Sequence, residues 1–102
     1  MAIAQVSIVP LGTGSTSLSP FVARVAGWLE EKGVKYQLTP MGTILEGEAP
    51  EILALIAQMH ELPFEAGAAR VMTLITLDDR RDKKATAQGK VKSVTSKLSK
   101  NR

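Results

Sequence analysis

Residues 34–46 of this chain are Val34-Lys35-Tyr36-Gln37-Leu38-Thr39-Pro40-Met41-Gly42-Thr43-Ile44-Leu45-Glu46. Apolar and polar side chains alternate over the first half of this segment, which is typical of a half-buried strand. A tight turn is predicted next, because proline stands at its second position and glycine at its last. The chain then returns as a strand from Thr43 to Glu46, so the segment predicts a β-hairpin.

One strand and one helix are predicted before the hairpin. The strand runs from Ala2 to Val9, and we expect Pro10 to end it because proline has no N–H group for the ladder. Ser19 is predicted to cap a helix that has proline at its first position and a continuous apolar stripe. Gly33 is predicted to end this helix in a left-handed conformation.

A helix, a strand and a last helix are predicted after the hairpin. The helix begins at Pro50 and is expected to close at Pro63 and Gly67, and a strand follows from Arg70 to Leu77. A weaker C-terminal helix is predicted over about residues 85–99. The order β-α-β-β-α-β with one added helix indicates an α+β fold, a ferredoxin-like sandwich, formed by residues 1–102 as a single domain.

One face of the predicted sheet has no helix to cover it, because two helices can cover only one face of four strands. In the first strand this face carries the residues Ile3, Gln5, Ser7 and Val9. Its apolar groups are expected to be buried in an oligomer. Gln5 and Ser7 are therefore candidates to line a pocket between subunits.

Composition excludes several classes of protein. The chain has no cysteine, so it has neither disulfides nor thiolate metal sites. No apolar run approaches the ~20 residues that span a bilayer, and no signal peptide is recognisable. A cytoplasmic location is therefore expected, and no membrane partner is expected.

Residues 1–78 carry a net charge of −4 and residues 79–102 carry +7. The basic tail lacks interleaved aromatic residues, which makes a nucleic-acid partner unlikely.

The charged segment Asp78-Asp79-Arg80-Arg81-Asp82-Lys83 links the last strand to the C-terminal helix. It is interpreted as a salt-bridge network that fixes this helix to the body. Phosphate binding by the two arginines is disfavoured, because the three aspartates would repel an anion.

The loop Gly12-Thr13-Gly14-Ser15-Thr16-Ser17 lies between a strand and a helix. Backbone N–H groups in such a loop can hold an anion, but a plain turn fits the same residues. The loop lacks the Gly-Lys-Ser/Thr ending of a P-loop and the glycine spacing of a dinucleotide-binding fingerprint.

Thr43 and Glu46 are the polar candidates on the returning strand. They are three residues apart, so a regular strand directs them to opposite faces. Glu46 and Glu48 without a nearby histidine or cysteine are a weak metal signal, and we expect no metal site. His60 has no partner nucleophile in the sequence, so we expect no catalytic residues and no enzymatic activity.

The chain resembles the thiamine-binding protein family of small ferredoxin-like proteins, formerly an uncharacterised protein family. Four segments in order carry the resemblance: Val9 to Gly14, Tyr36 to Thr43 with Glu46-Gly47-Glu48, Gly67-Ala68-Ala69-Arg70-Val71, and Asp78 to Lys83. It implies a homotetramer built as a dimer of dimers, with no enzymatic activity and no cofactor. It also implies binding of thiamine, or of its hydroxymethylpyrimidine part, in a pocket at a subunit boundary.

By position, the resemblance assigns five residues to this pocket, namely Thr13, Gly14, Ser15, Thr43 and Glu46. Together with Gln5 and Ser7 they form the predicted ligand-binding set. The alternative interpretation is a regulatory or structural oligomeric protein that has protein partners and binds no small molecule.

Overall fold

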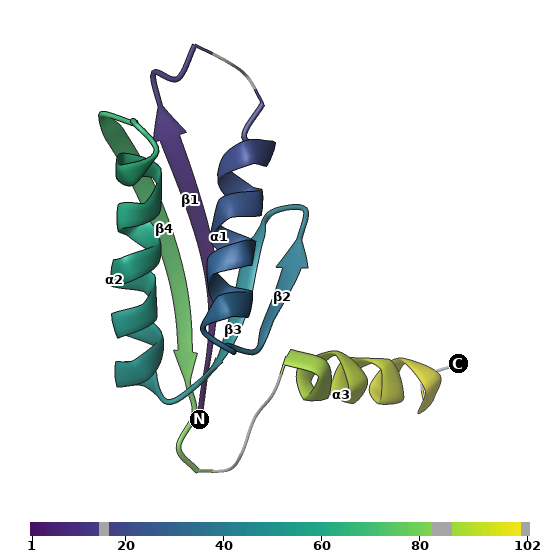
Figure 1. Ribbon diagram of the computed structural model, residues 1–102. Coiled ribbons are helices and arrows are strands. Elements are labelled where there is room, and N and C mark those ends of the chain that lie inside the picture. The colour runs from purple at the N-terminus through teal and green to yellow at the C-terminus, as the bar shows by residue number, and fades with distance from the viewer. Residues whose placement is uncertain (15–16, 83–86, 101–102) are drawn as a thin grey trace.

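The computed structural model describes residues 1–14, 17–82 and 87–100, and Figure 1 shows how its elements are arranged. Their order confirms the predicted ferredoxin-like pattern with an added helix: β1 (Ala2–Leu11), α1 (Ser19–Glu31), β2 (Tyr36–Thr39), β3 (Gly42–Gly47), α2 (Ala49–Glu65), β4 (Arg70–Asp79) and α3 (Ala87–Lys100). The four strands form one antiparallel sheet in the order β2-β3-β1-β4. Helices α1 and α2 cover one face of this sheet.

The two neighbours of β1 pair with different lengths of it. β4 pairs with β1 without interruption from Ala2 to Leu11, whereas β3 pairs with it only from Ala2 to Val6. The prediction that Pro10 ends the strand is therefore wrong. Beyond Val6 the β3 side of β1 has no ladder, so a residue without an N–H group is tolerated there.

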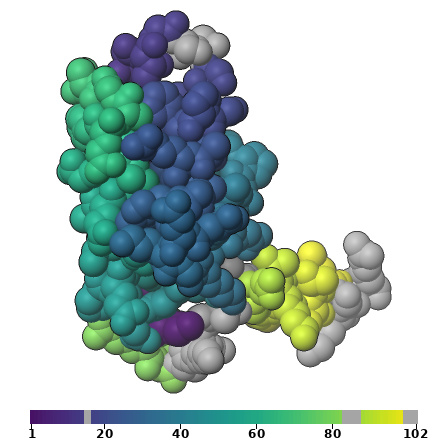
Figure 2. All heavy atoms as spheres, viewed as in Figure 1, coloured from purple at the N-terminus to yellow at the C-terminus, as the bar shows by residue number. Residues whose placement is uncertain are grey.

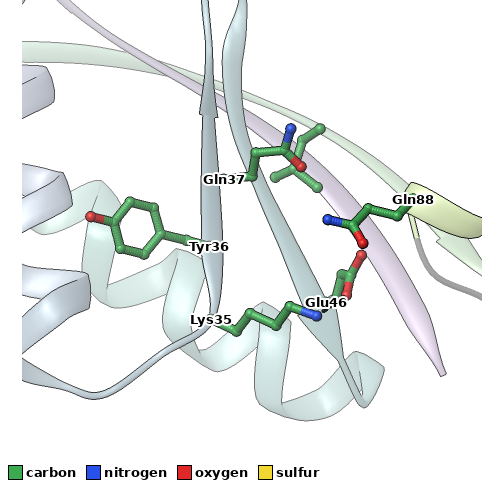
Figure 3. Close-up of a pocket in the computed structure, with 6 residues that line it drawn as sticks. Lys35, Tyr36, Gln37, Glu46 and Gln88 are labelled. Carbon is green, nitrogen blue, oxygen red and sulfur yellow. Dashed lines mark ion pairs between the residues drawn. The ribbon is translucent and has the colours of Figure 1, made fainter. Parts of the chain in front are cut away.

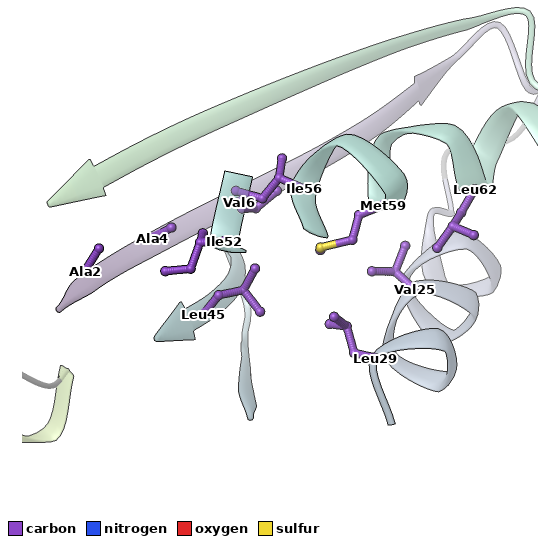
Figure 4. Packing of buried hydrophobic residues seen from close by; sticks show 10 residues of the cluster. All are labelled: Ala2, Ala4, Val6, Val25, Leu29, Leu45, Ile52, Ile56, Met59 and Leu62. Carbon is purple, nitrogen blue, oxygen red and sulfur yellow. The ribbon is translucent and has the colours of Figure 1, made fainter. Parts of the chain in front are cut away.

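The hydrophobic core lies between the sheet and the two covering helices, as Figure 4 shows. Alternate residues of β1 point into it, and their partners on β3 and the helices close around them. The buried members are Ala2, Ala4, Val6, Val25, Leu29, Leu45, Ile52, Ile56, Met59 and Leu62. Small alanines on β1 let α2 approach the sheet closely, and larger side chains from the helices fill the remaining space.

Two helix boundaries differ from the prediction. Leu18, not Ser19, is the N-cap of α1; its carbonyl accepts the N–H groups of Phe21 and Val22, and no side chain caps the helix. Pro63 lies inside α2, which continues to Glu65. A proline so close to the helix end removes one backbone hydrogen bond without stopping the last turn.

The other face of the sheet is open, as predicted, and the side chains of Ile3, Gln5 and Ser7 lie on it. Helix α3 projects sideways from the lower end of the body in Figure 2, and its residues Gln88 and Val91 lie beside Ile44 at the β2–β3 end of this face. Its apolar residues Val91, Val94 and Leu98 are more than half exposed. The ion pair between Lys90 of α3 and Asp78 of β4 agrees with the predicted role of the charged segment.

Candidate functional site

A cleft of about 670 Å³ lies between the first half of α1, the end of β1 and the turn that joins β2 to β3. Its volume is within the range of about 300–1,000 Å³ that is usual for small-molecule sites. The lining residues from the helix are Leu18, Ser19, Phe21, Val22, Ala23 and Val25. The cleft is therefore walled mainly by apolar side chains.

The cleft exists because β3 is shorter than β1. Beyond the Val6–Thr43 pair β3 turns away, and Ser7, Ile8 and Val9 line the cleft instead of facing a third strand. The backbone of this part of β1 forms ladder bonds on the β4 side only. It therefore offers a ligand the polar groups of an unpaired strand edge.

The cleft passes from one face of the sheet to the other. Val6 and Ile8 belong to the face that the helices cover, whereas Ser7 and Val9 belong to the open face. A second copy of the chain packed on the open face would close that mouth of the cleft. The geometry is thus compatible with the predicted position of a pocket at a subunit boundary.

Four residues with hydroxyl groups line the cleft, namely Ser7, Ser19, Thr39 and Thr43, and two of these hydroxyl groups form hydrogen bonds with the turn. Ser7 Oγ donates to the carbonyl oxygen of Met41 at 2.8 Å, and Thr39 Oγ1 donates to that of Gly42 at 2.8 Å. Thr43 is only 8% exposed, and its hydroxyl forms no hydrogen bond with the residues that the structure describes. Thr43 therefore has unused hydrogen-bonding capacity at the wall of the cleft.

The cleft is electrically neutral, because none of the described residues that line it carries a charge. An anion would find no cationic partner in it, and a cation would find no carboxylate. Its apolar walls and hydroxyl groups instead suit a flat neutral ring with polar atoms on its edge.

A second, smaller pocket of about 80 Å³ lies on the open face, and Figure 3 shows the side chains around it. Glu46 is almost buried there, with its side chain 10% exposed and its Oε2 atom 3.2 Å from Lys35 Nζ. The amides of Gln37 and Gln88 complete the polar lining. This pocket by itself has room for a few waters or a small polar group. It adjoins a pocket of about 490 Å³ beside α3, with which it shares Gln37, Ile44 and Gln88.

The ring of Tyr36 points to the opposite side of β2 from this pocket in Figure 3. Its hydroxyl donates to Glu30 Oε1 at 2.7 Å. This hydrogen bond is the main cause that raises the pKa of Tyr36 above its ordinary value of 10.0. Tyr36 therefore links β2 to the end of α1 as a neutral phenol.

The structure divides the predicted ligand-binding set into separate groups. Thr43 and Ser7 line the cleft, whereas Gln5 and Glu46 lie on the open face where β1 and β3 are paired. Thr13 and Gly14 follow β1 in the loop, and Ser15 lies outside the described residues. Within a single chain, the described members of the set therefore do not all line one pocket.

The sequence did not point to the apolar wall of the cleft. Phe21 and Val22 belong to a stripe that the spacing assigned to the core, but they line the cleft opposite the end of β1. One feature of the sequence could have indicated the cleft, namely the unequal length of the predicted strands. The first strand has more residues than the strand from Thr43 to Glu46 can pair with. Only the strand register shows that the unpaired residues of β1 lie beyond Val6.

Neither a metal-binding group nor a membrane-spanning helix is present in the part of the chain that the structure describes. No group of three or more His, Asp or Glu side chains among them is placed to hold a metal ion. None of the helices in this part of the chain is long and apolar enough to cross a membrane.

Comparisons with known proteins agree with this architecture. The family model of the thiamine-binding protein matches residues 4–95. UPF0045 protein YqgV of Bacillus subtilis is 49% identical over 102 residues, which cover 96% of this chain and 98% of that protein. The crystal structure of the hypothetical protein MJ1052 from Methanocaldococcus jannaschii is 33% identical, with a TM-score of 0.80 and coverage of 92% of this chain and 95% of that one.

A third similarity extends to a more distant structure. TM0486 from Thermotoga maritima, whose name refers to thiamine biosynthesis or salvage, has a TM-score of 0.74 at 22% identity. The match covers 91% of this chain and 97% of that one. At this identity the likeness shows a shared fold.

Proposed function

The chain belongs to the thiamine-binding protein family, and we propose that it binds thiamine, or the hydroxymethylpyrimidine part of thiamine, without converting it chemically. The observation that carries this proposal is the cleft beside the end of β3. It combines apolar walls with the hydroxyl group of Thr43, a residue that is only 8% exposed and whose hydroxyl has no hydrogen-bond partner among the described residues.

The chemistry of the pyrimidine matches this cleft. The ring is flat and neutral, its nitrogen atoms accept hydrogen bonds and its amino group donates them. The Thr43 hydroxyl can donate or accept, and the free edge of β1 adds backbone N–H and C=O groups. Phe21, Val22 and Leu38 supply the apolar contact for the ring faces.

The thiazolium ring of thiamine is cationic and has no partner inside the neutral cleft. We place it toward the mouth, where water stabilises its charge and the net charge of −4 carried by residues 1–78 favours a cation. Most of the binding free energy then comes from the pyrimidine, so the free hydroxymethylpyrimidine is expected to bind nearly as well as thiamine.

We further propose that the chain functions as a homotetramer, a dimer of dimers, in which a second copy covers the open face of the sheet. Exposed apolar side chains on this face, Met72 and Leu74 among them, support this packing. The second copy would close the mouth of the cleft that Ser7 and Val9 form, and the site would then lie at a subunit boundary.

Titration calorimetry with thiamine and with hydroxymethylpyrimidine tests the ligand directly. Saturable heat with both compounds is expected, and recovery of both unchanged after incubation would show binding without conversion. Absence of heat with either compound at millimolar concentration would remove the proposal. A stable tetramer that binds neither compound would favour the alternative, a regulatory or structural protein with protein partners.

A further inference from the structure

Strand β1 continues past the start of β3, and beyond Val6 its only neighbour strand is β4 (Figure 1). Ile8 lies in this segment and lines the cleft. We propose that the backbone N–H and C=O groups of Ile8 together recognise the 4-amino edge of the pyrimidine, and that they select aminopyrimidines as the ligand class. This inference rests on the proposed function and specifies how the ligand is recognised.

The backbone groups of Ile8 point away from β4. In an antiparallel ladder the N–H and C=O groups of one residue point to the same side, and the side alternates from residue to residue. The carbonyl oxygen of Val6 points toward β3, since a Cβ atom added to Gly42 of that strand would lie 2.8 Å from it. The groups of Ile8 therefore point to the same side as those of Val6, where the ladder with β3 has ended.

Pro10 supports this assignment of sides. It is the next residue of β1 whose backbone points in the same direction as that of Ile8. β4 pairs with β1 through Pro10 without interruption, which a proline allows where its nitrogen faces away from the partner strand. The backbone groups of Ser7 and Val9 point the other way, toward β4.

The turn between β2 and β3 leaves the backbone of Ile8 available. If the ladder continued, Met41 would lie opposite Ile8. The N–H groups of Met41 and Gly42 instead donate to Thr39 Oγ1, at 3.3 Å and 3.1 Å. The carbonyl oxygen of Met41 accepts the hydroxyl of Ser7. None of the residues that the structure describes therefore forms a hydrogen bond with the backbone of Ile8 on this side.

An aminopyrimidine can take the place of the missing strand residue. Its 4-amino group donates a hydrogen bond, and the neighbouring ring nitrogen accepts one. Ile8 presents the complementary pair, an acceptor and a donor side by side, as it would to a residue of a paired strand. The ring then lies along the plane of the sheet, with one face toward Phe21 and Val22 of α1.

The order of the two groups fixes the direction of the ring. Along β1 the N–H group of Ile8 precedes its C=O group, so the ring nitrogen lies toward Val6 and the amino group toward Pro10. The 5-substituent, which carries the thiazolium in thiamine, is next to the amino group and points away from the turn at Gly42. A 4-oxo pyrimidine has its donor and acceptor in the reverse order. It satisfies both groups only when turned over, which directs its 5-substituent at the turn.

Titration calorimetry with two compounds tests the ligand side of this inference. The compounds are hydroxymethylpyrimidine and the analogue in which an oxo group replaces the 4-amino group. The dissociation constant of the oxo analogue is expected to be at least about 10-fold higher, because the backbone of Ile8 is then left unsatisfied. Equal affinities for the two compounds would overturn the proposed selection of aminopyrimidines.

Ile8→Pro tests the protein side, because it removes the N–H group and keeps the carbonyl group. Pro10 shows that β1 accommodates a proline with this orientation, so the variant is expected to fold, which circular dichroism checks. Ile8→Val, whose side chain is close to proline in size, keeps the N–H group and is the matched control. Hydroxymethylpyrimidine is expected to bind Ile8→Pro at least about 10-fold more weakly than Ile8→Val. Equal affinities would overturn the role of Ile8.

Amide hydrogen exchange of the unaltered protein is a second measurement that needs no variant. Without ligand, the N–H group of Ile8 is expected to exchange faster than those of Ser7 and Val9, which face β4. Saturation with hydroxymethylpyrimidine is expected to slow exchange at Ile8 by at least about 10-fold. Unchanged exchange at Ile8 together with heat of binding would overturn this recognition and leave the proposed function intact. Absence of heat with both thiamine and hydroxymethylpyrimidine would instead remove the proposed function itself.

Discussion

Thr43 and Glu46 stand on the same strand, β3, and face opposite sides of the sheet. Thr43 is 8% exposed at the wall of the cleft beneath α1, whereas the carboxylate of Glu46 lies 3.2 Å from Lys35 Nζ on the open face. One bound molecule cannot contact both side chains within one chain. Substitutions of the two residues are therefore predicted to have different effects on ligand affinity.

Thr43→Val keeps the shape of the side chain and removes its hydroxyl. We expect the dissociation constant for hydroxymethylpyrimidine to rise about 2- to 10-fold, the loss of one neutral hydrogen bond of about 0.5–1.5 kcal/mol. Calorimetric titration measures the change. Thr76→Val, the same replacement at an exposed position of β4, is the matched control and is expected to bind like the wild type.

Glu46→Gln is expected to leave the affinity for hydroxymethylpyrimidine within about twofold of the wild type, because the carboxylate lies outside the cleft. The same titration measures it. A large loss of affinity with Glu46→Gln and none with Thr43→Val would place the ligand on the open face and contradict the proposed site.

Leu29 is fully buried between α1 and the sheet, whereas Leu53 on α2 is 45% exposed. We expect Leu29→Ala to lower the free energy of unfolding by about 2–5 kcal/mol, through lost apolar burial and the cavity that remains. Leu53→Ala removes the same atoms from the surface and is expected to cost less than about 1 kcal/mol. Urea denaturation at one fixed protein concentration compares them, and equal losses would contradict the described core.

Gly42 at the turn has no room for a side chain. A Cβ atom there would lie 2.8 Å from the carbonyl oxygen of Val6, a backbone atom that cannot move away easily. Gly42→Ala is expected to lower the free energy of unfolding by about 1–3 kcal/mol. The same denaturation experiment measures this change.

Gly27 provides the matched control for Gly42. It lies inside α1, where an added Cβ atom would meet nothing within 4 Å. Gly27→Ala is expected to raise the free energy of unfolding by about 0.5–1 kcal/mol, because alanine loses less backbone entropy in a helix. Opposite signs for the two substitutions would confirm the close contact at the turn, whereas stabilisation by both would contradict it.

Tyr36 is the only tyrosine, so the ultraviolet absorbance of tyrosinate reports on it alone. Its hydrogen bond to Glu30 raises its pKa above 10.0. The folded state favours the neutral phenol. The hydrogen bond therefore contributes fully to stability at pH values below the pKa of Tyr36 in the unfolded chain. This contribution is lost as the pH rises through the pKa of Tyr36 in the folded protein. Glu30→Gln, which removes the charge, is expected to lower the pKa of Tyr36 in an absorbance titration. An unchanged value would contradict the contact.

The order of helices and strands was predictable because its signals are local. Alternation in residues 34–39 marks a strand, the proline and glycine at positions 40 and 42 mark a turn, and apolar spacing from Phe21 to Leu29 marks a helix. Such patterns involve residues close in sequence, whose backbone and side-chain preferences act before any distant contact forms. The open face was predictable from the number of elements, since two helices cannot cover both faces of a four-stranded sheet.

The position of the cleft depends on contacts between residues far apart in the chain. Whether β3 pairs with five residues of β1 or with all ten is set by the turn at Gly42, where β3 begins, and by the packing of the sheet as a whole. The sequence by itself determined the elements, their order and the uncovered face of the sheet. The tertiary structure decided that Thr43 and Ser7 meet at a cleft while Glu46 and Gln5 lie apart from it, because strand register is fixed by long-range packing and not by local preference.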